Sequence, residues 1–105
     1  MIQWLYKLLN RDPLGGLRSP EWSRVRSSWI KNNSYCAACG RKEQLEVHHI
    51  SPFHEFPNLE LNPLNLITLC RDCHLLIGHL RSFKSYNIDV KKDAEILLQK
   101  IATRP

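Results

Sequence analysis

The sequence contains no internal repeat, no low-complexity run and no apolar stretch long enough to cross a bilayer. Its apolar opening, residues 1–9, is too short for a membrane-spanning helix and lacks the basic start and cleavage site of a signal peptide. We therefore expect a cytoplasmic protein with no membrane partner. At 105 residues, it is predicted to form one small domain whose modest core would gain from a cross-link.

Cysteine is scarce, and its four copies form two C-x-x-C pairs, Cys36 with Cys39 and Cys70 with Cys73. A disulfide framework is a poor explanation in a reducing compartment, whereas two such pairs can complete one tetrahedral zinc site. Zinc binding would then contribute to folding, on the order of 10 kcal/mol in zinc-finger peptides. Residues 40–69 between the pairs exceed the insert of a simple zinc ribbon, and this insert contains histidines.

The net charge of +5 is unevenly distributed. Lysine and arginine predominate in residues 1–35 and 80–105, whereas the slightly acidic middle carries all five histidines. Basic arms around a histidine-rich centre suit a polyanion held over a reactive site. The alternative is a solvated basic surface without a partner, and charge alone does not exclude it.

Hydrophobic periodicity predicts the order helix, helix, strand, long loop, strand, helix, helix. The predicted helices cover residues 2–10, 20–31, 70–80 and 88–102, and the predicted strands cover 44–50 and 64–69. Prolines 52, 57 and 63 mark the long loop. Trp22 and Trp29 lie seven residues apart on an amphipathic helix, so we expect them to pack in the core rather than stack on bases.

Residues that could bind metal or act as a base cluster around the cysteine pairs. The run Glu46-Val47-His48-His49-Ile50 and Asn65 lie between the two pairs, and His74 directly follows the second. Adjacent strand residues point to opposite faces, so His48 and His49 cannot easily bind one ion. One would bind metal while the other faces a substrate water. A hairpin leading into the following helix would bring His48 close to His74.

The other two histidines are less clearly placed. His79 lies about 140° around an α-helix from His74, which predicts a phosphate contact or a plain surface residue. His54 is predicted to be a solvated residue of the long loop, near enough to visit the site.

In order and spacing, the segment from Cys36 to His74 resembles an HNH endonuclease of the four-cysteine zinc type. The matching stretches are Cys36-Ala37-Ala38-Cys39-Gly40, Leu45-Glu46-Val47-His48-His49-Ile50 and Asn65-Leu66-Ile67-Thr68-Leu69-Cys70-Arg71-Asp72-Cys73-His74. The resemblance implies an α+β fold with a ββα-metal (His-Me finger) core, a four-cysteine zinc site and flanking helices. We therefore expect a single nuclease domain over 1–105, with a helical extension at 1–34, a zinc-pinned core at 35–80 and a C-terminal helix at 81–105.

The resemblance also implies roles for individual residues. His48 and His74 would bind a catalytic metal, and His49 would be the general base. Asn65 would either bind the metal or orient the base or loop, and Glu46 would support a ligand from behind. Gly78 departs from colicin-type nucleases, which place a further ligand there, so the number of ligands stays open.

The implied activity is metal-dependent hydrolysis of DNA, leaving 5′-phosphate ends. A neutral imidazole can take the proton of a water at neutral pH, and a divalent ion stabilises charge on the phosphate. The expected cofactors are a structural Zn²⁺ and a catalytic Mg²⁺, Mn²⁺, Ni²⁺ or Zn²⁺. The expected partner is duplex DNA, and the family analogy points to a stand-alone nuclease of a phage or mobile element. The residues expected to contact DNA are Arg24, Arg26, Arg71, Arg81 and Lys84.

Two other functions are open to such a chain. The first is a zinc-ribbon module that binds nucleic acid without catalysis, but His48, His49, Asn65 and His74 would be needless there. The second is a nuclease toxin restrained by an immunity protein, but the sequence shows no secretion domain or acidic partner tail to support it.

Overall fold

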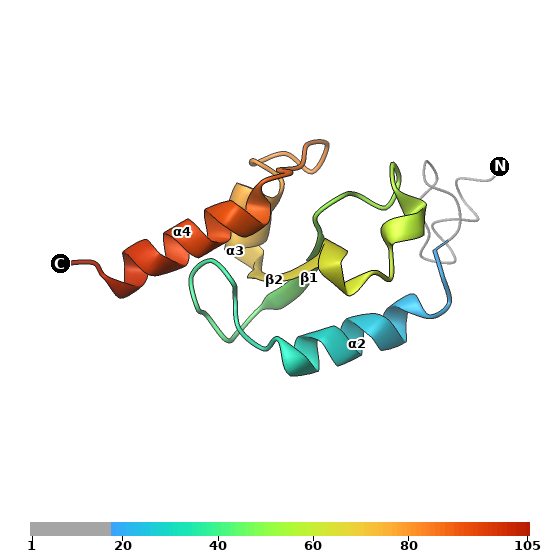
Figure 1. Cartoon of the computed structure of the whole chain (residues 1–105), viewed down its shortest axis with the longest axis horizontal. Coiled ribbons are helices and arrows are strands. Elements are labelled where there is room, and N and C mark those ends of the chain that lie inside the picture. The colour runs from blue at the N-terminus through green and yellow to red at the C-terminus, as the bar shows by residue number, and fades with distance from the viewer. Residues whose placement is uncertain (1–17) are drawn as a thin grey trace.

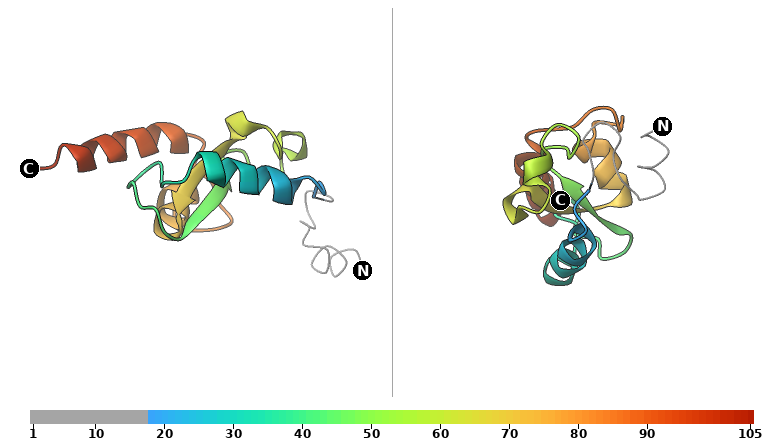
Figure 2. Two further views of the ribbon diagram at one scale, coloured as in Figure 1. Left: turned by 90° about the horizontal axis from the view of Figure 1, so that it is seen from below. Right: turned by 90° about the vertical axis from the view of Figure 1, so that its right-hand side faces the viewer.

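The computed structural model describes residues 18–105, so the helix predicted over 2–10 lies outside the described part. A two-stranded hairpin lies at the centre, with helix α2 (Trp22–Asn32) along one side and helix α4 (Val90–Ala102) on another (Figure 1). A second viewing direction shows α4 continuing past the hairpin (Figure 2). Within residues 18–105, no helix is long and apolar enough to span a membrane.

The hairpin pairs β1 (Leu45–His49) with β2 (Leu66–Cys70) in antiparallel register, from Leu45 opposite Cys70 to His49 opposite Leu66. Every residue of β2 is buried, whereas β1 buries only His48 fully. The predicted α+β fold is confirmed, and both strands lie within two residues of the predicted bounds.

The remaining elements are short. Two 3₁₀ turns, Pro57–Leu59 and Pro63–Asn65, occupy the loop between the strands. After β2, helix α3 (Arg71–Cys73) continues directly into a π-helical turn (His74–Gly78), where a single α-helix over 70–80 had been predicted. This difference decides the geometry of the site.

The core contains the cysteine pairs themselves. Cys36, Cys70, Leu69 and Val90 are each at most 1% exposed and belong to one buried cluster. Ala94 of α4 packs into the same cluster. The C-terminal helix is therefore anchored on the strand and turns that carry the thiols.

Helix α2 is attached to β2 through a buried hydroxyl. Trp29 Nε1 donates a hydrogen bond to Thr68 Oγ1 at 3.0 Å, and Thr68 Oγ1 donates to the carbonyl of Asn33 at 2.8 Å. Thr68 is only 3% exposed. Trp29 thus contacts the hairpin but is only partly buried, and neither Trp22 nor Trp29 belongs to the buried core, so the prediction that both pack in the core was wrong.

We expect Thr68→Val to lower the free energy of unfolding by about 1–3 kcal/mol, because it leaves the Trp29 N–H and the Asn33 carbonyl without their partner. Denaturant melts would measure the change. Thr103→Val is the matched control, since its hydroxyl bonds Gln99 at an exposed helix end. Equal losses in the two variants would contradict the proposed attachment.

Candidate metal and catalytic site

Three histidines converge beside the hairpin. His48 comes from β1, His74 begins the π-turn and His79 follows it. Their ring centroids are 4.8 to 4.9 Å apart. One nitrogen from each ring lies within 4.8 Å of the others, a grouping that could hold a metal ion. The predicted approach of His48 to His74 is confirmed.

The π-turn explains why His79 joins them. The backbone N–H of His79 donates to the carbonyl of His74 at 3.0 Å, a five-residue return. In an α-helix a residue five positions on points about 140° away, so the prediction that His79 is turned away from His74 was wrong.

Gly78 is the sequence signal that could have revealed this arrangement. A Cβ atom at Gly78 would lie 3.2 Å from His74 Cδ2 and 3.4 Å from His48 Cε1. The place where colicin-type nucleases carry a ligand is thus left empty of side chain, and the wide turn instead brings His79 beside His48 and His74.

Hydrogen bonds determine which ring nitrogens face the cluster. His79 Nδ1 lies 2.7 Å from the carbonyl of Ser85, so it must carry the proton, because a carbonyl only accepts. His74 Nδ1 lies 2.8 Å from Glu46 Oε1. In the neutral form of each ring, a proton on Nδ1 leaves the lone pair on Nε2, and Glu46 lies behind His74.

His48 Nε2 is buried and has no hydrogen-bond partner, and the residue is 2% exposed. Burial, followed by the neighbouring His74 and His79, lowers the pKa of His48 to about 3. Burial also lowers the pKa of His79. At neutral pH these two imidazoles are uncharged, the form in which histidine binds metal.

His49 points to the other face of β1, as predicted. Its Nε2 lies 2.9 Å from the backbone carbonyl of Glu60 and therefore carries the proton, which leaves a lone pair on Nδ1. The ring packs on Trp22 with centroids 4.5 Å apart. Burial lowers the pKa of His49, so its free nitrogen is unprotonated at neutral pH.

A cavity of about 210 Å³ joins the two sides of the site. Its lining includes the three clustered histidines together with His49, and it also includes His54. Arg18, Phe53 and Phe83 complete the wall near these rings. This cavity, called the histidine cavity below, is where a substrate can meet both a metal held by the cluster and the lone pair of His49.

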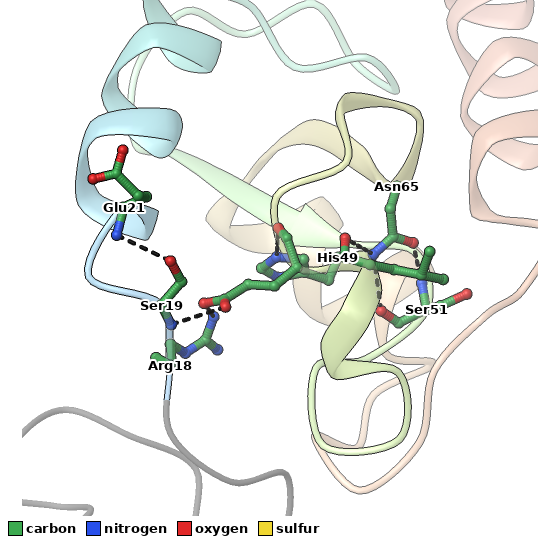
Figure 3. Close-up of polar contacts among 8 residues, drawn as sticks. Arg18, Ser19, Glu21, His49, Ser51 and Asn65 are labelled. Carbon is green, nitrogen blue, oxygen red and sulfur yellow. Dashed lines mark hydrogen bonds and ion pairs between the residues drawn. The ribbon is translucent and has the colours of Figure 1, made fainter.

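Glu60 is a buried acid beside the site that the sequence did not single out. It is 4% exposed, accepts the Ser19 N–H at 3.0 Å and lies 3.4 Å from the Arg18 guanidinium. Arg18 extends over Phe53, with its guanidinium carbon 4.7 Å from the ring centroid. Figure 3 shows Arg18 and Ser19 together just before helix α2, across from His49. A single acid in a loop has no periodic signature, so only the fold reveals it.

Asn65 lies at the neck of the long loop. Its Oδ1 accepts from the Ser51 N–H at 2.8 Å, and its Nδ2 donates to the carbonyls of Ser51 and Leu59 at 3.1 and 3.2 Å (Figure 3). The residue is 6% exposed. Its amide is thus occupied by loop backbone, which is the contact pattern of a loop-orienting residue.

The four cysteines form the second candidate metal group. Their sulfurs lie within 4.8 Å of one another, and all four are free thiols. Burial and the neighbouring sulfurs of Cys36 and Cys70 raise the pKa of Cys73. Four thiolates this close repel one another unless a cation lies among them, so the group fits a tetrahedral metal ion.

The basic residues expected to contact DNA are exposed on two segments. Arg24 and Arg26 lie on α2, and Arg24 pairs with Glu21. Arg71 begins α3, with its Nε 3.9 Å from Glu46 Oε2, and Arg81 and Lys84 follow the π-turn.

Comparison with known proteins yields one match. Residues 36–79 match the family model described as HNH endonuclease. No curated protein and no solved structure matches the chain. The matched segment contains both cysteine pairs, the hairpin and all three clustered histidines. Over residues 36–79 the chain is therefore similar to the HNH endonuclease family, and its two-stranded sheet, helices and four-cysteine cluster are consistent with a ββα-metal fold.

Proposed function

We propose that the protein is a metal-dependent endonuclease that hydrolyses DNA phosphodiester bonds. The observation that carries the proposal is the unpartnered Nε2 of His48, buried beside two imidazoles whose Nδ1 atoms are already engaged. A buried polar atom without a partner costs about 1–3 kcal/mol. A divalent cation at His48, His74 and His79 satisfies all three nitrogens at once.

His49 is the proposed general base. Its Nδ1 lone pair takes the proton of the attacking water, and the Glu60 carbonyl on Nε2 stabilises the imidazolium that forms. Glu60 holds that carbonyl in place by binding Ser19 and Arg18. Arg18, which lines the same cavity, is placed to contact the phosphate. A bound divalent ion supplies Lewis-acid stabilisation of charge on the phosphate and the leaving oxygen.

The two metal groups differ in chemistry. Four thiolates suit a structural Zn²⁺. Of the four ions considered for the catalytic group, an all-imidazole set favours Ni²⁺ or Zn²⁺ over Mg²⁺ or Mn²⁺, which prefer oxygen ligands. Asn65 is then a positioning residue for the loop that carries Glu60 rather than a ligand.

The substrate and setting extend this proposal. We take DNA, double-stranded in the main, as the substrate, because basic residues flank the matched segment on both sides. The free thiols fit a reducing, cytoplasmic setting. Family analogy points to a stand-alone nuclease of the phage type. We take the chain as one domain, with a helical extension at 1–34, the zinc-pinned core at 35–80 and the C-terminal helix at 81–105. A binding-only zinc module would not need the histidine cluster, and no observation on residues 18–105 favours a toxin.

Replacing Cys73 by Ser should remove one zinc per chain and abolish the cooperative thermal melt, because the ion and the core share these thiols. Metal analysis and calorimetry would measure both. His74→Ala is the control: it follows Cys73 in the chain but should keep the zinc of the four-cysteine site and the melt. A Cys73→Ser protein that melts normally without zinc would contradict the assignment.

Two assays, Ni²⁺ uptake and plasmid cleavage, should distinguish the proposed metal ligands from the proposed general base. His48→Ala and His79→Ala should lose uptake of Ni²⁺ by zinc-loaded protein, measured by titration calorimetry. His49→Ala should keep that uptake but cleave supercoiled plasmid about 10²–10⁴-fold more slowly, as expected for a lost general base. His54→Ala, another histidine of the cavity, should also keep uptake. The assigned roles would be contradicted if the His49→Ala protein no longer took up Ni²⁺, or if the His79→Ala protein still did.

Replacing Arg26 by Ala should weaken duplex binding and lower the slope of log affinity against log salt by about one, because one phosphate contact is lost. Arg104→Ala, two residues beyond the end of α4, should change neither. Anisotropy titrations at several salt concentrations would measure the slopes, and equal slopes for both variants would exclude α2 from the DNA surface.

A further inference from the structure

Phe83 is an exposed aromatic residue at the edge of the histidine cavity. It is 67% exposed, yet its ring centroid lies 4.9 Å from that of His79 and 6.2 Å from that of His74. A large apolar ring left open to water directly beside the metal-binding histidines is available to a ligand.

The backbone just before Phe83 is strained and is held by hydrogen bonds. Leu80 and Arg81 have φ angles of 52° and 70°, a left-handed conformation that costs a non-glycine residue on the order of 1 kcal/mol or more. The Arg81 N–H bonds the Leu75 carbonyl at 2.8 Å, and the Ser82 N–H bonds the His79 carbonyl at 3.0 Å. Strain of this kind persists where the surrounding structure fixes it, and it gathers at functional sites.

A second cavity, of about 560 Å³, lies on the other side of Phe83. Leu75 and Leu76 supply its apolar wall, and Arg71 and Arg81 supply guanidinium groups. Two acids also line it, Glu46, which bonds His74, and Asp72. Because Phe83 belongs to both cavities, a group in this second cavity would be the immediate neighbour of a phosphate in the histidine cavity.

A nucleobase suits this chemistry better than a second protein surface. The face of a base stacks on an aromatic ring, and arginine can stack on the base or bind its polar edge. The two arginines of the lining are balanced by two acids, so its charge does not select a partner, but two copies of a chain with net charge +5 repel each other as they approach. The position of Phe83 beside the cavity proposed for the phosphate favours a base of the same nucleic acid.

We propose that Phe83 and the cavity beside it bind an unstacked nucleobase of the nucleotide next to the phosphate at the histidine site. This inference rests on the proposed function for its substrate. Unstacking a base costs a few kcal/mol in perfect duplex and least where the base is mismatched or unpaired. The protein should therefore bind duplex DNA more tightly where the base beside the site is mismatched or unpaired than where it is perfectly paired.

The test is the binding of a fluorescein-labelled oligothymidylate, followed by anisotropy on zinc-loaded protein with no other metal added. Phe83→Ala should weaken binding about tenfold or more, because a lost base–aromatic stack typically costs that much. Phe83→Leu should weaken it similarly, and Phe83→Trp should retain it. Phe56→Ala is the matched control, a 39% exposed aromatic that lines neither cavity.

The proposal is overturned if Phe83→Ala binds within about twofold of the unmodified protein, or if Phe83→Leu binds as well as Phe83→Trp. It is also overturned if sedimentation shows a dimer that Phe83→Ala dissociates, since the surface would then bind a second copy. Retained Ni²⁺ uptake shows that each variant is folded around the site. Binding needs no turnover, so a protein that binds as expected but never cleaves DNA would contradict the proposed function alone.

Discussion

In the π-turn His74–Gly78, the N–H of His79 reaches back to the His74 carbonyl, and this single return sets the positions of two imidazoles. It stacks His79 beside His74, against His48 of the hairpin. Gly78 makes the approach possible, because a side chain there would press on both His48 and His74. The chain leaving the turn then supplies the Ser85 carbonyl that fixes the His79 ring. The positions of the candidate metal ligands and of the loop after the turn therefore depend on the same few backbone hydrogen bonds.

The two metal groups share one short stretch of chain. Cys70 ends β2, Cys73 ends α3 and His74 begins the π-turn. The core cluster that buries the thiols also holds α4. A structural ion at the cysteines would thus stabilise the strand and turn that position the histidines, and it would couple folding to the proposed catalysis through adjacent residues. His49 stands apart, oriented by the Glu60 carbonyl, and Asn65 and the contacts of Glu60 hold that loop.

Much of this arrangement could be predicted from the sequence, for physical reasons that can be named. Two-residue alternation placed His48 and His49 on opposite faces, and the cysteine spacing predicted a four-thiol group. His79 was misplaced because the 3.6-residue period was applied to a segment that forms a wider turn. Glu60 and Arg18 were missed because their partnership spans 42 residues and follows from the fold rather than from any local pattern.

The central claim is that His48, His74 and His79 hold one divalent ion through their Nε2 atoms. Anomalous diffraction from crystals grown with Ni²⁺, recorded at the zinc and nickel edges, tests it most directly. The account predicts a zinc peak among the four cysteine sulfurs and a nickel peak within bonding distance of all three histidine nitrogens. A nickel peak bound by His48 and His74 but not His79, or no peak at the cluster, would contradict it.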